Sequence, residues 1–241
     1  MSFPQLRWER AMSSGLNVAE LTAFAHDTRT HVRSIVVTSQ MLLRRPGLDG
    51  EVVRTLEKVI SDAKQIDGLT TATVNYVCLA GASEAPLRAT KLPTLLRGLV
   101  LEMGPAVSKA NGQLTVGDAP AVMVPAGLSW ILRELICNSL KFVTDKSPEI
   151  TVDTELTGTT VAVRVKDNGP GLPAERVDEA FSPYKRLHRQ IPGGYGLGLP
   201  TAMRIAEVCG GSLATGPTRE GCEILIHWPI SDLGADESME R

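Results

Sequence analysis

Residues 17–45 read NVAELTAFAHDTRTHVRSIVVTSQMLLRR, and apolar or small side chains recur in them at alternating steps of three and four. The recurring positions are Val18, Leu21, Ala25, Thr28, Val32, Ile35, Ser39 and Leu42. Because a helix turns once every 3.6 residues, these positions form one stripe along its surface. Pro46 and Gly47 follow and should end the helix. The stretch therefore predicts a long helix that packs in a bundle.

A second helix with the same spacing is predicted from about Glu51 to Leu79. Its stripe consists of Val52, Leu56, Val59, Ala63, Ile66, Thr70, Thr73 and Val77. The short connection between the two helices makes them antiparallel neighbours. Two helices with one narrow stripe cannot bury it by themselves, so we expect two copies of the chain to form a four-helix bundle.

The remaining sequence predicts a mixture of helices and strands. Helices are expected over 93–111, 125–143 and 197–209, with Pro125 in the first turn of the second. Strands are expected over 113–116, 121–124, 149–156, 159–166, 212–215 and 222–228, with a hairpin around Thr157-Gly158. The fold class is therefore α+β, a helical hairpin followed by a sandwich of helices on a mostly antiparallel sheet.

The predicted domain organisation follows from these elements. It comprises a lead over 1–16, a stem over 17–80, a linker over 81–86, a second domain over 87–230 and a polar tail over 231–241. Sixteen residues are too few for a sensor domain, so we expect a separate sensor protein or a truncated sensor module.

Composition excludes several functional classes. A net charge of −2 and an aromatic content of 4% do not favour binding to nucleic acid. No apolar run approaches the roughly 20 residues that a membrane helix needs, and no signal peptide is recognisable. We therefore expect a cytoplasmic protein without a membrane segment. The four cysteines lack the close spacing of a zinc site or a disulfide framework.

A histidine with a neighbouring carboxylate lies in the first predicted helix. Ala25 belongs to the stripe, so His26 falls one step around the helix, on its exposed flank. Neutral imidazole is a nucleophile near pH 7, and Asp27 could fix its tautomer and accept a proton. Thr30 is one helical turn further and shares the face of His26. Taken alone, this cluster favours an ordinary solvated surface histidine.

Three further clusters follow in the second domain. Glu134, Asn138 and Lys141 share one helical face, where the oxygens suit Mg²⁺ and the ammonium suits phosphate. A solvated amphipathic face would give the same spacing. Asp167-Asn168-Gly169-Pro170-Gly171-Leu172 follows a strand. Its glycines permit close approach of a ligand, and its Asp could accept a hydrogen bond from an amino group, although a tight turn also explains it.

The last cluster is Gly193-Gly194-Tyr195-Gly196-Leu197-Gly198-Leu199-Pro200, at the start of a predicted helix. Glycine-rich backbone amides at a helix N-terminus can bind phosphate, although a flexible loop has the same composition.

The order of these clusters resembles that of the sensor histidine kinases. His26 to Thr30 is similar to the H-box, Glu134 to Phe142 to the N-box, and Asp167 to Leu172 to the G1 box. Phe181 to His188 is similar to the F-box, Gly194 to Leu199 to the G2 box, and Gly210-Gly211-Ser212 to the end of the ATP-binding domain. The resemblance covers roughly residues 17–230 and rests on order and spacing as well as on composition.

The resemblance implies a dimerisation and histidine-phosphotransfer stem followed by a GHKL-type ATP-binding domain. His26 would receive the γ-phosphate of ATP, assisted by Asp27, and pass it to an aspartate of a response regulator. Thr30 matches the position that serves the reverse, phosphatase reaction. Asn138 and Glu134 would hold Mg²⁺, and a lid over 175–194 would close on the nucleotide. The nucleotide-binding residues would be Asn138, Lys141, Asp167, Gly169, Gly171, Tyr184, Lys185, Arg186, Gly194, Gly196, Leu197, Gly198 and Leu199.

The chain departs from the family pattern at His31, where relatives have proline. Without that proline the helix keeps a backbone hydrogen bond, so bending of this helix during signalling is in doubt. His31 is an alternative phosphate acceptor, although the flanking Asp27 and Arg29 favour His26. Two other functions stay open. One is a signalling scaffold with a degenerate kinase domain, and the other is a GHKL ATPase or a serine kinase that acts on an anti-sigma partner.

Overall fold

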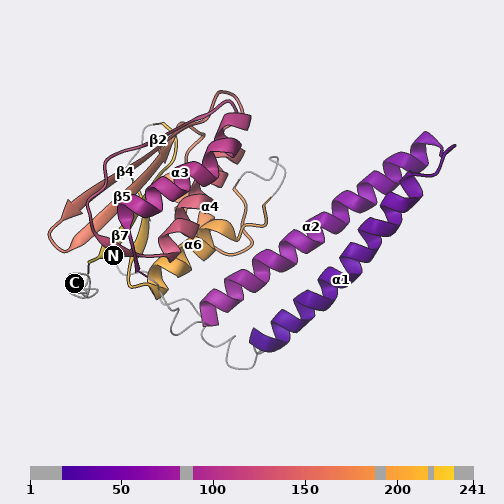
Figure 1. The fold of residues 1–241 in the computed structure, drawn as a ribbon, viewed down its shortest axis with the longest axis horizontal. Helices are drawn as coiled ribbons and strands as arrows, with labels where there is room; N and C mark the ends of the chain where they lie inside the picture. Colours follow the sequence, from indigo (N-terminus) through magenta and orange to yellow (C-terminus); the bar gives the residue numbers. More distant parts are fainter. Residues whose placement is uncertain (1–17, 82–88, 188–193, 217–219, 231–241) are drawn as a thin grey trace, which may run out of the picture. The chain divides into compact units, whose positions relative to one another are not determined.

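The computed structural model describes residues 18–81, 89–187, 194–216 and 220–230 (Figure 1). The chain divides into two compact units, residues 1–81 and residues 82–241. The lead predicted over 1–16, residues 82–86 of the linker predicted over 81–86, and the tail over 231–241 lie outside the described residues. Within the described residues, no helix is both long and apolar enough to span a membrane.

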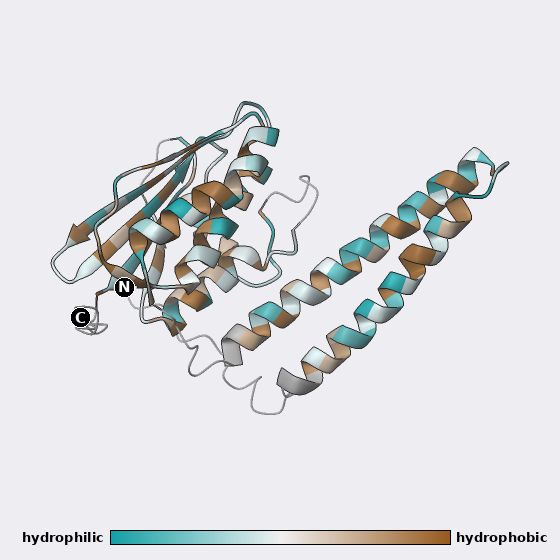
Figure 2. Ribbon diagram, viewed as in Figure 1, coloured by the Kyte–Doolittle hydropathy of each residue, from teal (hydrophilic) through white to brown (hydrophobic). Residues whose placement is uncertain are grey.

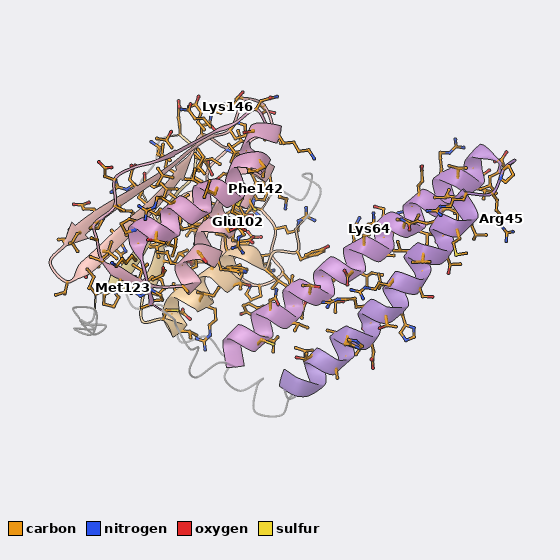
Figure 3. The ribbon with its side chains drawn as sticks, in the orientation of Figure 1. Arg45, Lys64, Glu102, Met123, Phe142 and Lys146 are labelled. Carbon is orange, nitrogen blue, oxygen red and sulfur yellow. The ribbon has the colours of Figure 1, made fainter. Side chains whose placement is uncertain are left out.

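The first unit is a hairpin of two long helices. Helix α1 spans Val18–Leu43 and helix α2 spans Gly50–Gly81, as the spacing of the apolar residues predicted. A left-handed backbone at Gly47, with φ of 79°, turns the chain between them. The Asp49 side chain then accepts a hydrogen bond of 2.7 Å from the backbone N–H of Glu51, which satisfies a free donor at the start of α2. Figure 3 labels Arg45 at this end of the hairpin.

The predicted stripe is only partly covered within one hairpin. Ala25, Val32, Ser39 and Ala63 are buried between α1 and α2. Other stripe positions retain large exposed apolar side chains, namely Ile35, Val52, Val59 and Ile66. Figure 2 shows hydrophobic segments along both helices. The single hairpin therefore leaves apolar surface in contact with water.

The second unit is built on a five-stranded sheet with the order β2-β4-β5-β7-β6. Its strands are β2 (Gln113–Val116), β4 (Glu149–Thr157), β5 (Thr160–Asp167), β6 (Ser212–Thr215) and β7 (Glu223–Pro229). The β2–β4 pair is parallel and the other pairs are antiparallel. A separate two-stranded sheet joins β1 (Ala89–Lys91), which the sequence pattern did not predict, to β3 (Met123–Pro125).

Three helices cover one face of the five-stranded sheet (Figure 1). They are α3 (Leu92–Lys109), α4 (Gly127–Phe142) and α6 (Gly198–Val208). Alternate strand residues such as Val152, Val163 and Ile226 are buried, because successive side chains in a strand point to opposite faces. Two short elements, η2 (Ala174–Arg176) and α5 (Val177–Ala180), were not predicted. The predicted α+β architecture is confirmed.

Two local predictions were wrong. Pro125 is the last residue of β3, paired with Ala89, and not part of the first turn of α4, which starts at Gly127. The buried side chain of Val124 continues the strand up to this point. The hairpin between β4 and β5 also turns one residue later than predicted, because Thr157 and Thr160 are still paired. Gly158, with φ of 58°, supplies the left-handed conformation that the two-residue turn requires.

Candidate phosphotransfer and nucleotide-binding sites

His26 lies on α1 with 78% of its side chain exposed. Its Nδ1 is 3.4 Å from Oδ1 of Asp27, a long contact between two solvated groups. The hydroxyl of Thr30 donates a hydrogen bond of 3.1 Å to the His26 carbonyl, within the same helix. The neighbouring Ala25 is buried against α2. The imidazole is therefore accessible, and its Nε2 points away from the Asp27 contact.

Arg29 connects the two stem helices one turn after His26. Its Nε lies 3.2 Å from Oδ1 of Asp67, and its Nη2 donates a hydrogen bond of 3.0 Å to Oγ1 of Thr71. Both acceptors belong to α2. Sequence reasoning used Arg29 only as a flank of His26 and did not identify these partners. To predict the contact between Arg29 and Asp67 one must know how the two helices are aligned along each other, and a local sequence pattern does not give this alignment.

The predicted face of α4 carries Glu134, Asn138 and Lys141, all half-buried. The opposite face of the helix, including Leu132 and Ile136, is buried in the core. Helix α4 is joined to α3 by an ion pair of 2.7 Å between Nε of Arg133 and Oε1 of Glu102. Figure 3 labels Glu102 on α3. The polar row is therefore fixed to a rigid helix, as a binding site requires.

The glycines of the G2 segment allow its backbone to approach this polar row. A Cβ atom at Gly198, the first residue of α6, would overlap the carboxylate of Glu134. One at Gly194 would overlap Nζ of Lys141. Gly194 also has φ of 80°, which residues with a side chain rarely adopt. The G2 glycines thus lie directly against N-box side chains that are more than 50 residues away in the sequence.

Two charged groups of this site, Glu134 and Lys141, have shifted pKa values. Burial raises the pKa of Glu134 above its ordinary range, and the nearby Lys141 ammonium opposes this shift. Burial and the positive charge of Arg186 lower the pKa of Lys141, while Glu134 acts in the opposite direction. Two cationic side chains, from α4 and from the F-box segment, are thus close enough to repel each other. A bound polyanion would relieve this repulsion.

Asp167, at the end of β5, is held by three elements. Its Oδ1 accepts hydrogen bonds from the backbone N–H groups of Gly169, at 2.8 Å, and Cys222, at 3.0 Å. Its Oδ2 accepts a hydrogen bond of 2.7 Å from the hydroxyl of Ser139 on α4. Sequence reasoning missed Ser139, whose position one residue after Asn138 was the available signal.

Glycine contacts also shape the loops around this carboxylate. Gly171 has φ of 75°, and a Cβ atom there would lie 2.6 Å from the carbonyl oxygen of Gly221. Gly196 accepts a backbone hydrogen bond of 2.9 Å from Tyr184, whose own φ is 62°. The F-box and G2 segments are therefore joined through their backbones.

The other predicted residues lie nearby in the sequence but differ in exposure. Leu197 is buried, Leu199 and Arg186 are half-buried, and Lys185 is exposed. Part of the predicted lid, residues 188–193, lies outside the described residues. The structure places the predicted nucleotide residues in the second unit and the histidine cluster in the first.

The donor set around Asn138 fits a magnesium ion that arrives with phosphates. Among the described residues there is no group of three or more His, Cys, Asp or Glu side chains that could hold a metal by itself. Glu134 and Asn138 offer one carboxylate and one amide oxygen from adjacent turns of α4. Mg²⁺ is commonly held by one or two protein oxygens together with substrate phosphates and water. The residues present are therefore compatible with a magnesium–nucleotide complex.

Most of the second unit matches a known protein family. Residues 123–232 match the family described as histidine kinase-, DNA gyrase B-, and HSP90-like ATPase. The matched range contains β3, α4, the G1, F-box and G2 segments and strands β4 to β7.

Two relatives match more of the chain than the family model does. The sensor protein KdpD of Rathayibacter rathayi is 31% identical over 166 residues, which are 67% of this chain and 19% of that protein. The adaptive-response sensory kinase SasA of Synechococcus sp. (strain JA-2-3B'a(2-13)) is 29% identical over 200 residues, which are 78% of this chain and 52% of that protein. The chain thus spans about a fifth to about a half of the length of these relatives.

Solved structures share the fold over most of the chain. Full-length ShkA, crystallised in complex with AMPPNP, matches with a TM-score of 0.71 and 20% identity over 90% of this chain and 46% of that one. The histidine kinase ThkA, crystallised with the response regulator protein TrrA, matches with a TM-score of 0.64 and 22% identity over 93% of this chain and 64% of that one.

The second unit is thus an ATPase domain of the histidine kinase, gyrase B and HSP90 class. With the helical hairpin that precedes this domain, the chain belongs to the sensor histidine kinases and represents their catalytic core.

Proposed function

We propose that this chain is an ATP-dependent protein-histidine kinase that phosphorylates His26 and passes the phosphoryl group to a response-regulator aspartate. The observation that carries the proposal is an exposed His26–Asp27 pair on a long helix, in one chain with glycines packed against the polar side chains of α4. In this proposal residues 17–80 are the phosphotransfer stem and residues 87–230 are the ATP-binding domain.

The second unit would bind ATP through contacts of three kinds. Asp167 accepts a hydrogen bond from the adenine amino group, because its carboxylate is fixed by the contacts of Ser139, Gly169 and Cys222. Lys141 and Arg186 neutralise the phosphates, and the phosphates in turn offset the repulsion between these two cations. The G2 amides at the start of α6 donate to phosphate oxygens. The AMPPNP complex of ShkA, a protein of the same fold, supports a nucleotide at this site.

Magnesium would be held by Asn138 and Glu134, and when bound it neutralises phosphate charge in the transferred group. The chain's own contribution is positioning. Glu134 is half-buried and lies against Gly198, so its carboxylate is confined to one place on the surface of α4. Confinement of this kind supplies much of the rate enhancement in phosphoryl transfer.

The transfer step uses the imidazole of His26 as nucleophile. The contact between Nδ1 and Asp27 favours the tautomer with the proton on Nδ1, which leaves the lone pair on Nε2. Nε2 forms a bond to the γ-phosphorus while the bond to the bridging oxygen breaks, and ADP leaves with that electron pair. Asp27 stabilises the positive charge of the imidazole and accepts the proton. The phosphoryl group then passes from Nε2 to a carboxylate oxygen of the regulator.

The stem would form a homodimer in which the exposed stripe residues of two hairpins cover each other. Ile35 and Ile66 are 44% and 50% exposed in one hairpin, although both belong to the predicted stripe. Burying such side chains contributes up to roughly 1.5–3 kcal/mol each. Small residues at Ala25, Ser39 and Ala63 permit close approach of the helices.

The partner of phosphotransfer would be a response regulator receiver domain. The ThkA complex with TrrA supports this, since ThkA has the same fold over 93% of this chain. We place the docking surface on the stem around His26. Thr30, one turn from His26, would position water for the reverse phosphatase reaction.

The decisive experiment is incubation with γ-labelled ATP and Mg²⁺, followed by tests of the label's stability in acid and in base. Acid-labile and base-stable label on the wild type, absent from His26→Ala, is the expected result. Label on both proteins would move the acceptor, most simply to His31. No label on either would favour a scaffold, or a kinase that stays inactive until its sensor is supplied, and loss of nucleotide binding would favour the scaffold of the two. Acid-stable label would favour a serine kinase.

A further inference from the structure

Ser139 is a buried hydroxyl on α4 that contacts the carboxylate proposed to bind adenine. Its side chain is 3% exposed, and its Oγ lies 2.7 Å from Oδ2 of Asp167 and 3.1 Å from the carbonyl oxygen of Leu135. A hydroxyl has one proton to donate. The carboxylate is the nearer and stronger acceptor, because hydrogen bonds to ionised groups are shorter and stronger than those to neutral ones. The geometry therefore directs the Ser139 proton to Asp167.

The contacts of the Asp167 carboxylate are divided unevenly between its two oxygens. Oδ1 accepts from the backbone N–H groups of Gly169 and Cys222, which occupies its two lone-pair directions. Oδ2 accepts from Ser139, and this leaves one direction on Oδ2 for a donor from outside the described residues. The backbone donors restrain the side-chain torsions of Asp167 through Oδ1 alone. The hydroxyl of Ser139 adds a restraint at the second oxygen, which narrows the range of orientations open to the carboxylate.

We propose that Ser139 is the positioning residue that aims Asp167 at the base, and that it thereby sets the preference for a purine with a 6-amino group over one with a 6-oxo group. The inference rests on the proposed binding of ATP. An amino group donates to the free direction on Oδ2, whereas a carbonyl oxygen in the same place brings two acceptors together. Discrimination of this kind depends on a fixed acceptor, because a rotating carboxylate can turn away from the carbonyl.

A purely structural role for Ser139 predicts a different result. In that case the hydroxyl only forms hydrogen bonds that stabilise the fold. Its removal then weakens the binding of all nucleotides equally, because the folded protein is less stable. The two roles are therefore separated by the ratio of two dissociation constants, and not by either constant alone.

The test is calorimetric titration of the full chain with ATP and with inosine triphosphate, both with Mg²⁺. These nucleotides differ at the 6-position and carry the same phosphates. The wild type should prefer ATP, so the dissociation constant for inosine triphosphate divided by that for ATP should be greater than one. Ser139→Ala should reduce this ratio by about tenfold, the typical effect of one charged hydrogen bond. Ser139→Cys, similar in size with a weaker donor, should give an intermediate ratio and guards against misfolding of the alanine variant.

Thr201→Val is the matched control, because it removes another hydroxyl that is 3% exposed but donates to the Leu197 carbonyl. It should lower stability and keep the wild-type ratio. A wild-type ratio in folded Ser139→Ala or Ser139→Cys overturns the inference and leaves the proposed function intact. A wild type that binds neither nucleotide overturns the proposed function, and the inference with it.

Discussion

The stem and the ATP-binding domain bury their apolar residues to very different extents. In the described part of the hairpin, the buried side chains are small or β-branched, namely Ala25, Val32, Ser39 and Ala63. In the second unit, large side chains such as Ile131, Leu132 and Ile226 are fully buried. The second unit therefore contains a core of its own, whereas a single hairpin leaves large apolar side chains exposed.

The two regions also hold their polar groups differently. Asp167 accepts three hydrogen bonds from neighbouring segments, whereas the stem's histidine and its carboxylate neighbour are both 78% exposed. A nucleotide site benefits from groups that are fixed in advance. A phosphate carrier must instead be accessible to a kinase domain and to a regulator in turn. The difference in burial thus corresponds to the difference in the proposed roles.

The largest expected effect is on the core of the second unit. Ile131→Ala should destabilise this unit by about 2–5 kcal/mol, because it removes a fully buried side chain and leaves a cavity. Urea denaturation, followed by tryptophan fluorescence, measures this change. Ile66→Ala in the stem is the matched control, and it should leave the unfolding transition of the second unit unchanged. If Ile66→Ala lowered the free energy of unfolding in that transition as much as Ile131→Ala does, the two units would unfold as one.

A second prediction separates catalysis from assembly. Asn138→Asp should weaken the use of Mg-ATP by at least about tenfold, because it adds negative charge beside Glu134 and the phosphates. The helical stem should be unaffected, so the dimer should persist. Autophosphorylation rate and sedimentation velocity measure the two properties on one preparation. Autophosphorylation at the wild-type rate would contradict the assignment of Asn138 as a metal ligand.

The sequence predicted the elements well where a regular period repeats many times. The stem helices have stripes of eight positions each, and their limits were found within two residues. Short elements without a period, such as β1 and α5, were missed. Pro125 was misplaced because proline suits both a first helical turn and the end of a strand, and pairing with Ala89 decides between them.

Candidate site residues could be predicted where they belong to a motif, but their supporting contacts could not. The row of Glu134, Asn138 and Lys141 follows from helical spacing. The contact of Ser139 with Asp167 joins residues 28 positions apart, and that of Arg29 with Thr71 joins residues 42 apart. Such pairs depend on how helices and strands pack, which a local pattern does not encode.

A third prediction tests the incomplete core of the stem. The double variant Ile35→Ser, Ile66→Ser should weaken the proposed dimer by about 1 kcal/mol per side chain, since each is about half exposed in one hairpin. The dissociation constant from analytical ultracentrifugation measures this change. Leu101→Ser on α3, which replaces an apolar side chain that is 80% exposed outside the stem, is the control. An unchanged dimer would show that these stripe residues do not form the interface.

A fourth prediction concerns pH and the buried carboxyl of the nucleotide site. Burial raises the pKa of Glu134 above 4.5, so between 4.5 and the folded pKa the folded protein holds a proton that the unfolded chain has released. The wild type therefore loses stability as the pH rises through this window. Glu134→Gln lacks this titration, so its stability relative to the wild type should increase from pH 4 to pH 7.

Urea denaturation at several pH values measures the difference, with Glu175→Gln at an exposed position as the control. A relative stability of Glu134→Gln that decreases with rising pH would mean that attraction to Lys141 outweighs burial.

The smallest expected effect concerns the ion pair between the stem helices. Arg29 and Asp67 are 37% and 42% exposed, so solvent screens their attraction. A double-mutant cycle with Arg29→Ala and Asp67→Ala should give a coupling of about 0.2–1 kcal/mol that decreases with salt. Lys58 and Asp62, an i,i+4 pair within α2 that is more exposed, form the control cycle and should couple more weakly. A coupling of Arg29 to Asp67 well above this range, insensitive to salt, would mean that the pair is buried in the assembled protein. The stem would then contain a desolvated polar contact one turn from His26, and the contrast with the fixed carboxylate of Asp167 would no longer hold.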